Sequence, residues 1–186
     1  MRLSLLLAFL SAALPAAAQE AGREQICALK PCRESRPLQI WLDQNRYLEV
    51  DLGGTVIAHE LNVSVYPGET HFITARMSDR QIVDLVPLTV GTTEANGLSV
   101  SMSQEKTKDG ELATLLKVTN LFGLPLRYEA YMDMDGSNEF RYTSSCPVGP
   151  GLTSYEHWPH AVVQIVMTNV RLLLESESDG DAVVCE

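Results

Sequence analysis

LRYEAYMDM, residues 126–134, alternates between two kinds of side chain over its whole length. One side of the pattern carries Leu126, Tyr128, Ala130, Met132 and Met134. The other side carries Arg127, Glu129, Tyr131 and Asp133. Because successive side chains of a β-strand point to opposite faces of its sheet, a repeat of two is the pattern of a half-buried strand. The stretch predicts a strand with one face in a core and the other in water.

The same repeat recurs through much of the chain. LSVSMS (98–103) alternates apolar residues with serines, and both LATLLKV (112–118) and residues 161–174 are rich in strand-forming residues. Turn signals separate these runs at Gly53-Gly54, Pro67-Gly68, Ser78-Asp79, Asn96-Gly97, Asp109-Gly110, Asn120 to Pro125, and Asp135-Gly136. Short alternating strands at this spacing predict an antiparallel sandwich or barrel. No convincing helix is expected after the first residues.

One stretch resembles a known architecture. KVTNLFGLPLRYEAYM (117–132) resembles the strand, asparagine-containing loop and proline-led strand of bacterial immunoglobulin-like sandwiches, including pilus-chaperone-like domains. In that pattern the asparagine, here Asn120, caps the loop, and the proline, here Pro125, starts an adjacent strand. VYPGETHFITARM (65–77) looks like another hairpin of that kind. The resemblance implies an all-β fold, a single antiparallel immunoglobulin-like β-sandwich domain, but it implies no activity.

The first residues predict export. MRLSLLLAFLSAALPAAAQE has one basic residue, an apolar stretch and an Ala-x-Ala cleavage signal, so residues 1–18 are expected to be a cleaved signal peptide. A retained membrane anchor is the alternative, but the apolar stretch is shorter than the roughly 20 residues that span a bilayer. We expect an irregular segment with a disulfide loop over 19–36, a β-sandwich domain over 37–186, and a periplasmic or secreted protein without membrane insertion.

The cysteines fit an exported protein. Their number is even, which favours two disulfides over metal or redox chemistry. Three pairings are possible, and we favour Cys27 with Cys32 and Cys146 with Cys185 because each end of the chain then carries its own cross-link. CALKPC (27–32) lacks the C-x-x-C spacing of redox pairs, so a structural role is favoured.

The charge of the chain limits its partners. The formal net charge is −10 at pH 7, which disfavours nucleic acid and anionic lipid because both would be repelled at long range.

SYEHWPHAVVQ (154–164) is the clearest candidate site. His157 and His160, with Met167 downstream, allow a soft-metal site for copper or zinc. However, a spacing of three puts the two histidines on opposite faces of a strand, and Pro159 disfavours a helix between them. We favour the interpretation that Trp158 is a large apolar residue at one end of the sandwich and that the two histidines are surface or hydrogen-bonded groups.

Two further patterns have competing interpretations. MDMDGSNEF (132–140) places oxygen-bearing side chains at alternate positions, as a calcium loop does, but the later positions of the loop motif do not match, and Asp-Gly favours a hairpin turn. His59 alternates with apolar residues and is expected to be a core histidine that points into an apolar face.

The chain contains none of the common catalytic or cofactor motifs, such as G-x-S-x-G or H-E-x-x-H. We therefore predict a non-enzymatic exported binding or assembly module of the bacterial cell envelope, with no cofactor and with another envelope protein as its partner. The contact is expected through an exposed sheet edge or the loops at one end of the sandwich. Tyr155 and Trp158 are the predicted interface residues of that loop surface, because aromatic residues supply much interface energy. The alternative is a periplasmic copper- or zinc-binding protein that uses His157 and His160 and possibly Met167. A hydrolase that uses His59 or acidic residues is a third hypothesis, which a polar pocket with a paired histidine and carboxylate would favour.

Overall fold

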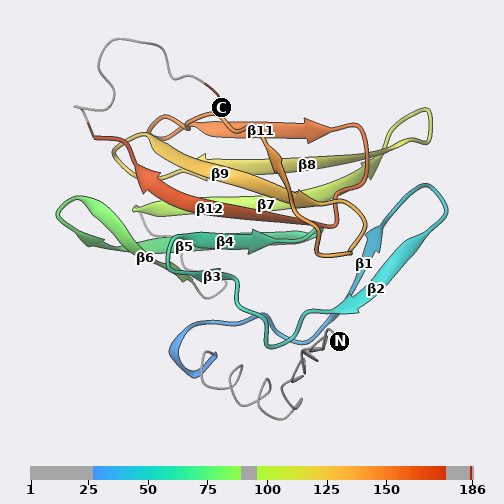
Figure 1. Cartoon of the computed structure of the whole chain (residues 1–186), viewed down its shortest axis with the longest axis horizontal. Helices are drawn as coiled ribbons and strands as arrows, with labels where there is room; N and C mark the ends of the chain where they lie inside the picture. Colours follow the sequence, from blue (N-terminus) through green and yellow to red (C-terminus); the bar gives the residue numbers. More distant parts are fainter. Residues whose placement is uncertain (1–26, 89–95, 175–184, 186) are drawn as a thin grey trace, which may run out of the picture.

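The computed structural model describes residues 27–88, 96–174 and 185 (Figure 1). Residues 27–29 form a single helical turn. The strands are β1 (Pro37–Trp41), β2 (Tyr47–Asp51), β3 (Ala58–His59), β4 (Asn62–Val65), β5 (Glu69–Ser78), β6 (Gln81–Pro87), β7 (Gly97–Lys106), β8 (Leu112–Asn120), β9 (Leu126–Asp133), β10 (Arg141–Thr143), β11 (Thr153–Trp158) and β12 (Gln164–Leu172).

The strands form two packed five-stranded sheets and a separate hairpin. The first, the β9 sheet, has the strand order β10-β9-β12-β4-β3, and the second, the β8 sheet, has the order β11-β8-β7-β5-β6. β1 and β2 pair only with each other and lie at one end of the two layers (Figure 1). All strand pairs are antiparallel. The prediction of an all-β antiparallel sandwich is confirmed.

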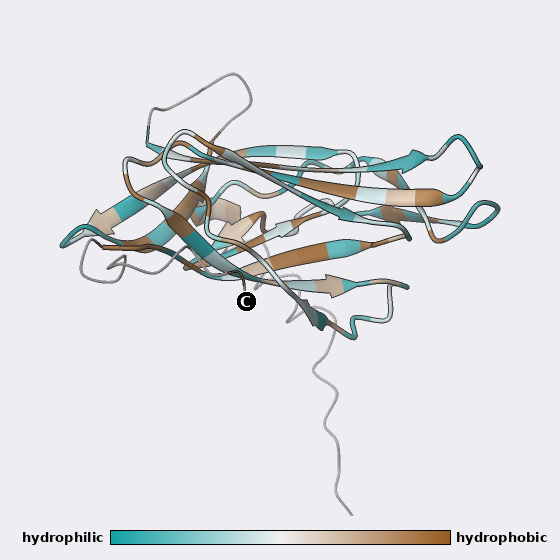
Figure 2. Ribbon diagram, turned by 90° about the horizontal axis from the view of Figure 1, so that it is seen from above, coloured by the Kyte–Doolittle hydropathy of each residue, from teal (hydrophilic) through white to brown (hydrophobic). Residues whose placement is uncertain are grey.

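The core lies between the two sheets and follows the predicted alternation. Leu98, Val100 and Met102 of β7 are buried, whereas the serines between them are half-buried on the other face. Leu126 and Tyr128 of β9 are buried in the same way. In Figure 2 the loops at the right-hand end are mostly hydrophilic, while hydrophobic segments lie along the strands. The burial of one face of each sheet against the other therefore holds the fold together.

The alternation of β9 fails at its last residue, and the prediction that Asp133 faces solvent is wrong. Asp133 is only 2% exposed. Its carboxylate accepts hydrogen bonds from the backbone N–H groups of Asp135, Gly136 and Asn138, at 3.1, 2.8 and 2.9 Å. The carboxylate thus organises the loop of the β9–β10 hairpin. The predicted hairpin is confirmed, with a longer loop than a two-residue Asp-Gly turn.

The asparagine of the resemblance has the expected role. Asn120 is buried at the end of β8, and its Nδ2 donates to the carbonyls of Leu124 and Val148 at 2.9 and 2.8 Å. Its Oδ1 accepts the N–H of Phe122 at 2.8 Å. Pro125 precedes β9, which lies in the opposite sheet. Asn120 therefore caps a loop that carries the chain from one sheet to the other.

The second stretch of the resemblance forms a different connection from the one expected. Residues 65–77 were expected to form a hairpin, but β4 belongs to the β9 sheet and β5 to the β8 sheet. The N–H of Glu69 donates to the carbonyl of Tyr66 at 3.1 Å, and Gly68 has a φ of 85°. Pro67 and Gly68 suit a turn in which the third residue needs positive φ. The turn carries the chain from one sheet to the other, so β4 and β5 do not pair with each other.

Two disulfides join the predicted cysteines. Cys27 pairs with Cys32, and Cys146 pairs with Cys185, with Cα–Cα distances of 5.3 and 4.2 Å. Such bonds are typical of proteins outside the cytoplasm. Within the described residues, no helix is long and apolar enough to cross a membrane. The predicted signal peptide, 1–18, lies outside the described residues, and the domain boundaries stay predictions.

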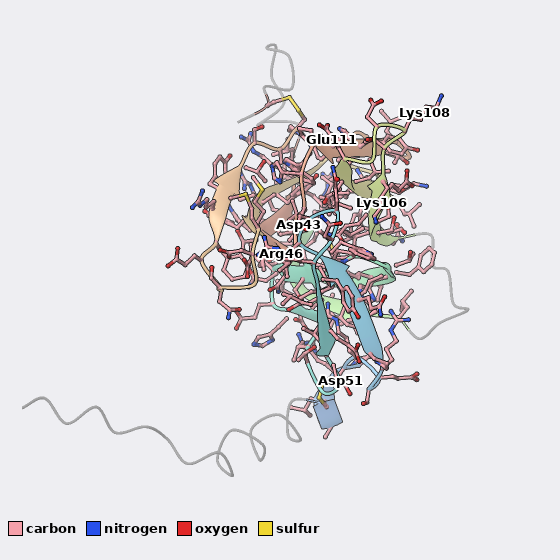
Figure 3. The ribbon with its side chains drawn as sticks, turned by 90° about the vertical axis from the view of Figure 1, so that its right-hand side faces the viewer. Asp43, Arg46, Asp51, Lys106, Lys108 and Glu111 are labelled. Carbon is pink, nitrogen blue, oxygen red and sulfur yellow. A yellow bond between two sulfur atoms is a disulfide. The ribbon has the colours of Figure 1, made fainter. Side chains whose placement is uncertain are left out.

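Gln104 attaches the β1–β2 hairpin to the sandwich. Its side-chain amide accepts the N–H of Trp41 and donates to the carbonyl of Trp41, both at 2.9 Å. It also donates to the carbonyl of Val162 at 3.2 Å. The ammonium of Lys106 lies 4.3 Å from the centre of a Trp41 ring. Figure 3 shows the turn of the hairpin, marked by Asp43 and Arg46, beside the end of β7.

Replacing Asn120 with alanine should destabilise the protein by roughly 3 kcal/mol, because two carbonyls and one N–H lose their partner inside the protein. Urea unfolding of the wild type and of Asn120→Ala measures the difference. Asn45→Ala, at an exposed turn position, is the matched control and should change stability by less than about 0.5 kcal/mol. Equal midpoints for both variants would contradict the capping role.

Candidate functional site

The outer edge of β11 carries backbone groups that face away from the sheet. β11 pairs with β8 alone. Because the N–H of Asn120 donates to the carbonyl of Leu152, the backbone groups of Asn120 face β11. Backbone groups alternate in direction along a strand, so those of Tyr155 and His157 face away from β8. No other strand of the described residues pairs with them.

The other edges are shorter or covered. β10 and β3 have three and two residues. β6 is longer, but the N–H of Leu85 donates to the carbonyl of Glu60 at 2.8 Å, so the β3–β4 turn occupies part of its outer edge. Natural proteins shorten or cover edge strands in these ways to prevent unwanted pairing. Of the edge strands of the two five-stranded sheets, β11 is therefore the one best able to accept another strand.

The two predicted interface residues point in opposite directions. Tyr155 is 62% exposed, and the ammonium of Lys117 lies 6.0 Å from the centre of its ring. Trp158 is partly buried and packs against the core. Its Nε1 lies 3.4 Å from Thr143 Oγ1. Tyr155 is thus available to a partner, while Trp158 fills the space at the end of the sandwich.

The predicted metal ligands do not lie together. His157 is exposed on β11, whereas Met167 is fully buried in the core within β12. His160 lies after β11, and its Nδ1 is 2.8 Å from the carbonyl oxygen of Ala161. The part of the chain that the structure describes contains no group of three or more His, Cys, Asp or Glu side chains that could hold a metal ion. Metal binding by the histidines stays a prediction.

The prediction that His59 lies in the core is wrong. The side chain of His59 is 58% exposed, and Ala58 is the buried residue of β3. Glu60, with a φ of 53°, begins a tight turn that pairs His59 with Asn62. This turn reverses the chain, so His59 does not continue the alternation of β4.

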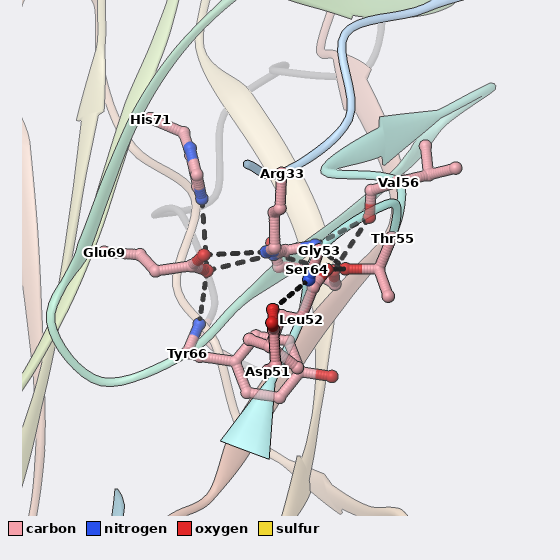
Figure 4. Close-up of polar contacts among 10 residues, drawn as sticks. All are labelled: Arg33, Asp51, Leu52, Gly53, Thr55, Val56, Ser64, Tyr66, Glu69 and His71. Atoms are coloured by element: carbon pink, nitrogen blue, oxygen red, sulfur yellow. Dashed lines mark hydrogen bonds and ion pairs between the residues drawn. The ribbon is translucent and has the colours of Figure 1, made fainter. Parts of the chain in front are cut away.

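A buried ion pair joins the N-terminal segment to both sheets. Arg33 donates two hydrogen bonds to the carboxylate of Glu69, at 2.7 and 2.9 Å (Figure 4). Its remaining N–H groups donate to the carbonyls of Val56 and Ser64 at 2.8 and 2.7 Å. Both side chains are almost wholly buried. A paired and fully bonded guanidinium of this kind can remain charged in the interior.

His71 extends this network. Its Nε2 lies 3.1 Å from Oε2 of Glu69, although the angle departs from that of a regular hydrogen bond. The same oxygen accepts the N–H of Tyr66 at 2.9 Å. Burial alone would raise the pKa of Glu69, but His71 and Arg33 together lower that pKa to about 2. Glu69 is therefore held as a carboxylate between two cationic or donor side chains.

A pocket of about 440 Å³ lies beside this network. Its polar lining includes Arg33, Glu69 and His71. Its other lining residues are Pro31, Cys32, Glu34, Arg36, Leu38, Leu52, Ile57, Gly68, Thr70, Phe72 and Leu88. The pocket therefore combines apolar walls with one histidine–carboxylate pair, which is a common composition of ligand sites.

Asp84 provides a second attachment of the N-terminal segment. Lys30 and Arg76 form ion pairs with its carboxylate, which also accepts the N–H of Glu60 at 3.1 Å. Burial raises the pKa of Asp84, but the two cations outweigh it and lower the pKa overall. Lys30 and Arg33 together anchor residues next to the Cys27–Cys32 loop onto the sandwich.

Comparison with known proteins adds no family to this description. The chain matches no protein-family model, no curated protein and no solved structure. The functional interpretation of this chain rests on the geometry of the β11 edge and of the pocket.

Sequence reasoning missed Arg33, Glu69 and His71. Glu69 and His71 are two residues apart, so a strand places them on one face, and this signal was available in ETHF (69–72). Arg33 carries no comparable signal, because its partner lies 36 positions away. Only the tertiary structure brings the three together.

Replacing Glu69 with glutamine should destabilise the protein by about 3–5 kcal/mol at pH 7, because Arg33 would remain buried without a counter-charge. The folded pKa of Glu69 is depressed from 4.5 to about 2, so its contribution is present above pH 4.5 and is lost as the pH falls toward 2. Urea unfolding between pH 2 and 7 measures both effects. Glu49→Gln, exposed on β2, is the control. An acid dependence of stability that is the same in Glu69→Gln and wild type would contradict this role.

Proposed function

We propose that this protein is a non-enzymatic exported binding module of the bacterial cell envelope, and that it binds another envelope protein through the outer edge of β11. The observation that carries the proposal is the row of outward backbone groups on this six-residue edge strand, with which no strand of the described ranges pairs. Two disulfides and the predicted signal peptide support export. The loop pattern around Asn120 supports an immunoglobulin-like type of sandwich.

The proposed mechanism is the addition of an extended segment of the partner to the β8 sheet. Main-chain hydrogen bonds to Tyr155 and His157 would supply affinity, and side-chain contacts would supply specificity. The exposed ring of Tyr155, with Lys117 beside it, offers a large contact surface at the centre of the edge. A net charge of −10 favours a partner with a basic or neutral surface at this edge.

A photo-reactive phenylalanine analogue at position 155, in the protein exported to the periplasm of a Gram-negative bacterium, should cross-link to one envelope protein. The same analogue at Lys108, in the β7–β8 loop, is the matched control and should give no such adduct. His157→Pro removes an outward N–H and should abolish the adduct, whereas His157→Ala keeps the N–H and should retain it. An adduct equally strong in both His157 variants, or none at position 155, would overturn the proposal.

A direct binding measurement distinguishes metal binding by the histidines from the proposed protein-binding function. Equilibrium dialysis with Cu²⁺ and Zn²⁺ should show no tight uptake by the wild type, because His157 and Met167 lie in different environments. Tight uptake that His157→Ala abolishes would instead favour metal handling as the function.

A further inference from the structure

The first half of β5 lacks a neighbour on its outer side. β7 pairs with β5 from Glu69 to Thr74, but β6 pairs with it only from Ile73 to Ser78. Beyond β6, one hydrogen bond from the N–H of Leu88 to the carbonyl of Phe72, 2.7 Å long, extends the pairing. Within the described residues, the strand position beside residues 69–71 is therefore vacant.

Thr70 offers backbone groups to this vacant position. Because the carbonyl of Phe72 faces Leu88, the backbone groups of Thr70, two residues earlier, face the same side. Thr70 is exposed, and no hydrogen bond to its backbone is formed on that side by residues 27–88 or 96–174. A polypeptide in line with β6 would satisfy both its N–H and its C=O.

The pocket adjoins the same edge. Thr70, His71 and Phe72 line it from β5, and Leu38 and Leu52 line it from the base of the β1–β2 hairpin. The walls are largely apolar, so the pocket suits a large apolar side chain.

The network around Glu69 determines the polar chemistry of the pocket. Arg33, Tyr66 and His71 all contact the carboxylate of Glu69, so it has little capacity left for a ligand. The charge of Arg33 is balanced by Glu69. The buried part of the pocket therefore suits an uncharged group.

We propose that this pocket and the outer edge of residues 69–71 form a second binding site, which takes an extended peptide segment of another polypeptide. The backbone of the peptide pairs with Thr70, and a large apolar side chain enters the pocket between Leu38 and Leu52. The site is separate from the β11 edge, because β5 and β11 lie on either side of β7 and β8 in the sheet.

Selection of a random peptide library displayed on phage, with the full exported chain as target, tests this site. Enriched peptides should bind Thr70→Ala as they bind wild type, because alanine keeps the backbone N–H. Thr70→Pro removes that N–H and should weaken binding at least about ten-fold. His157→Pro should leave the binding unchanged, so failure here is distinguishable from failure at β11. No enriched peptide, or equal affinity for both Thr70 variants, would overturn the proposal.

Hydrogen exchange provides a second measurement that does not depend on the folding of Thr70→Pro. The amide of Thr70 in wild type should exchange more slowly when a selected peptide is bound, and an unchanged rate would overturn backbone pairing. Fluorescence of N-phenyl-1-naphthylamine, a small apolar dye, tests whether the pocket binds a small apolar molecule instead of a peptide. Binding of this dye without binding of any peptide would mean that the pocket takes small apolar molecules instead.

Discussion

The burial of one apolar face of each sheet against the other is the constraint on which the rest of this structure depends. Residues such as Val65, Leu98, Leu116, Ile165 and Met167 come from both sheets and are fully buried between them. Their removal from water is the main favourable term in folding. Since hairpins alone cannot build two facing layers, the chain must repeatedly leave one sheet and enter the other. These crossings have to pass close to the apolar core.

Buried polar side chains occur where the chain leaves a sheet or turns sharply. Glu69 follows the turn between β4 and β5, and its carboxylate accepts the N–H of Tyr66. Asn120 ends β8 and bonds two backbone groups of the loop before β9 and the carbonyl of Val148, between β10 and β11. Asp133 ends β9 and bonds three N–H groups of the next loop. At each place the backbone lacks strand partners, and a side chain supplies the missing hydrogen bonds. These polar residues therefore make the close approach of loops to the core possible.

The N-terminal segment connects stability with the two proposed binding surfaces. Arg33 and Lys30 attach it to Glu69 and Asp84, and the Cys27–Cys32 bond closes a small loop that contains Lys30 and ends next to Arg33. The same segment forms one wall of the pocket. The β11 edge lies on the opposite side of the β8 sheet from β5 and the pocket. No residue of the N-terminal segment forms part of the β11 edge. Within the described residues, the protein thus presents one edge that no other strand pairs with and one edge whose pocket is formed in part by the N-terminal segment.

The positions of strands such as β7, β8 and β9, the hairpin after Asp133 and the cap at Asn120 were predicted from the sequence by itself, and the favoured one of three possible disulfide pairings is the one found. Each depends on local alternation, on turn chemistry or on the parity and position of cysteines. Local alternation predicts the wrong exposure for Asp133 and His59. The carboxylate of Asp133 is buried because it bonds a loop, and His59 is exposed because a turn reverses the chain after it. A repeat of two along the sequence signals neither feature. The sheet to which each strand belongs, and hence the crossing at Pro67-Gly68, was decided only in three dimensions. The same is true of the cluster of Arg33, Glu69 and His71 and of the free side of β11, because pairing between distant strands and burial of distant charges depend on the whole packed chain.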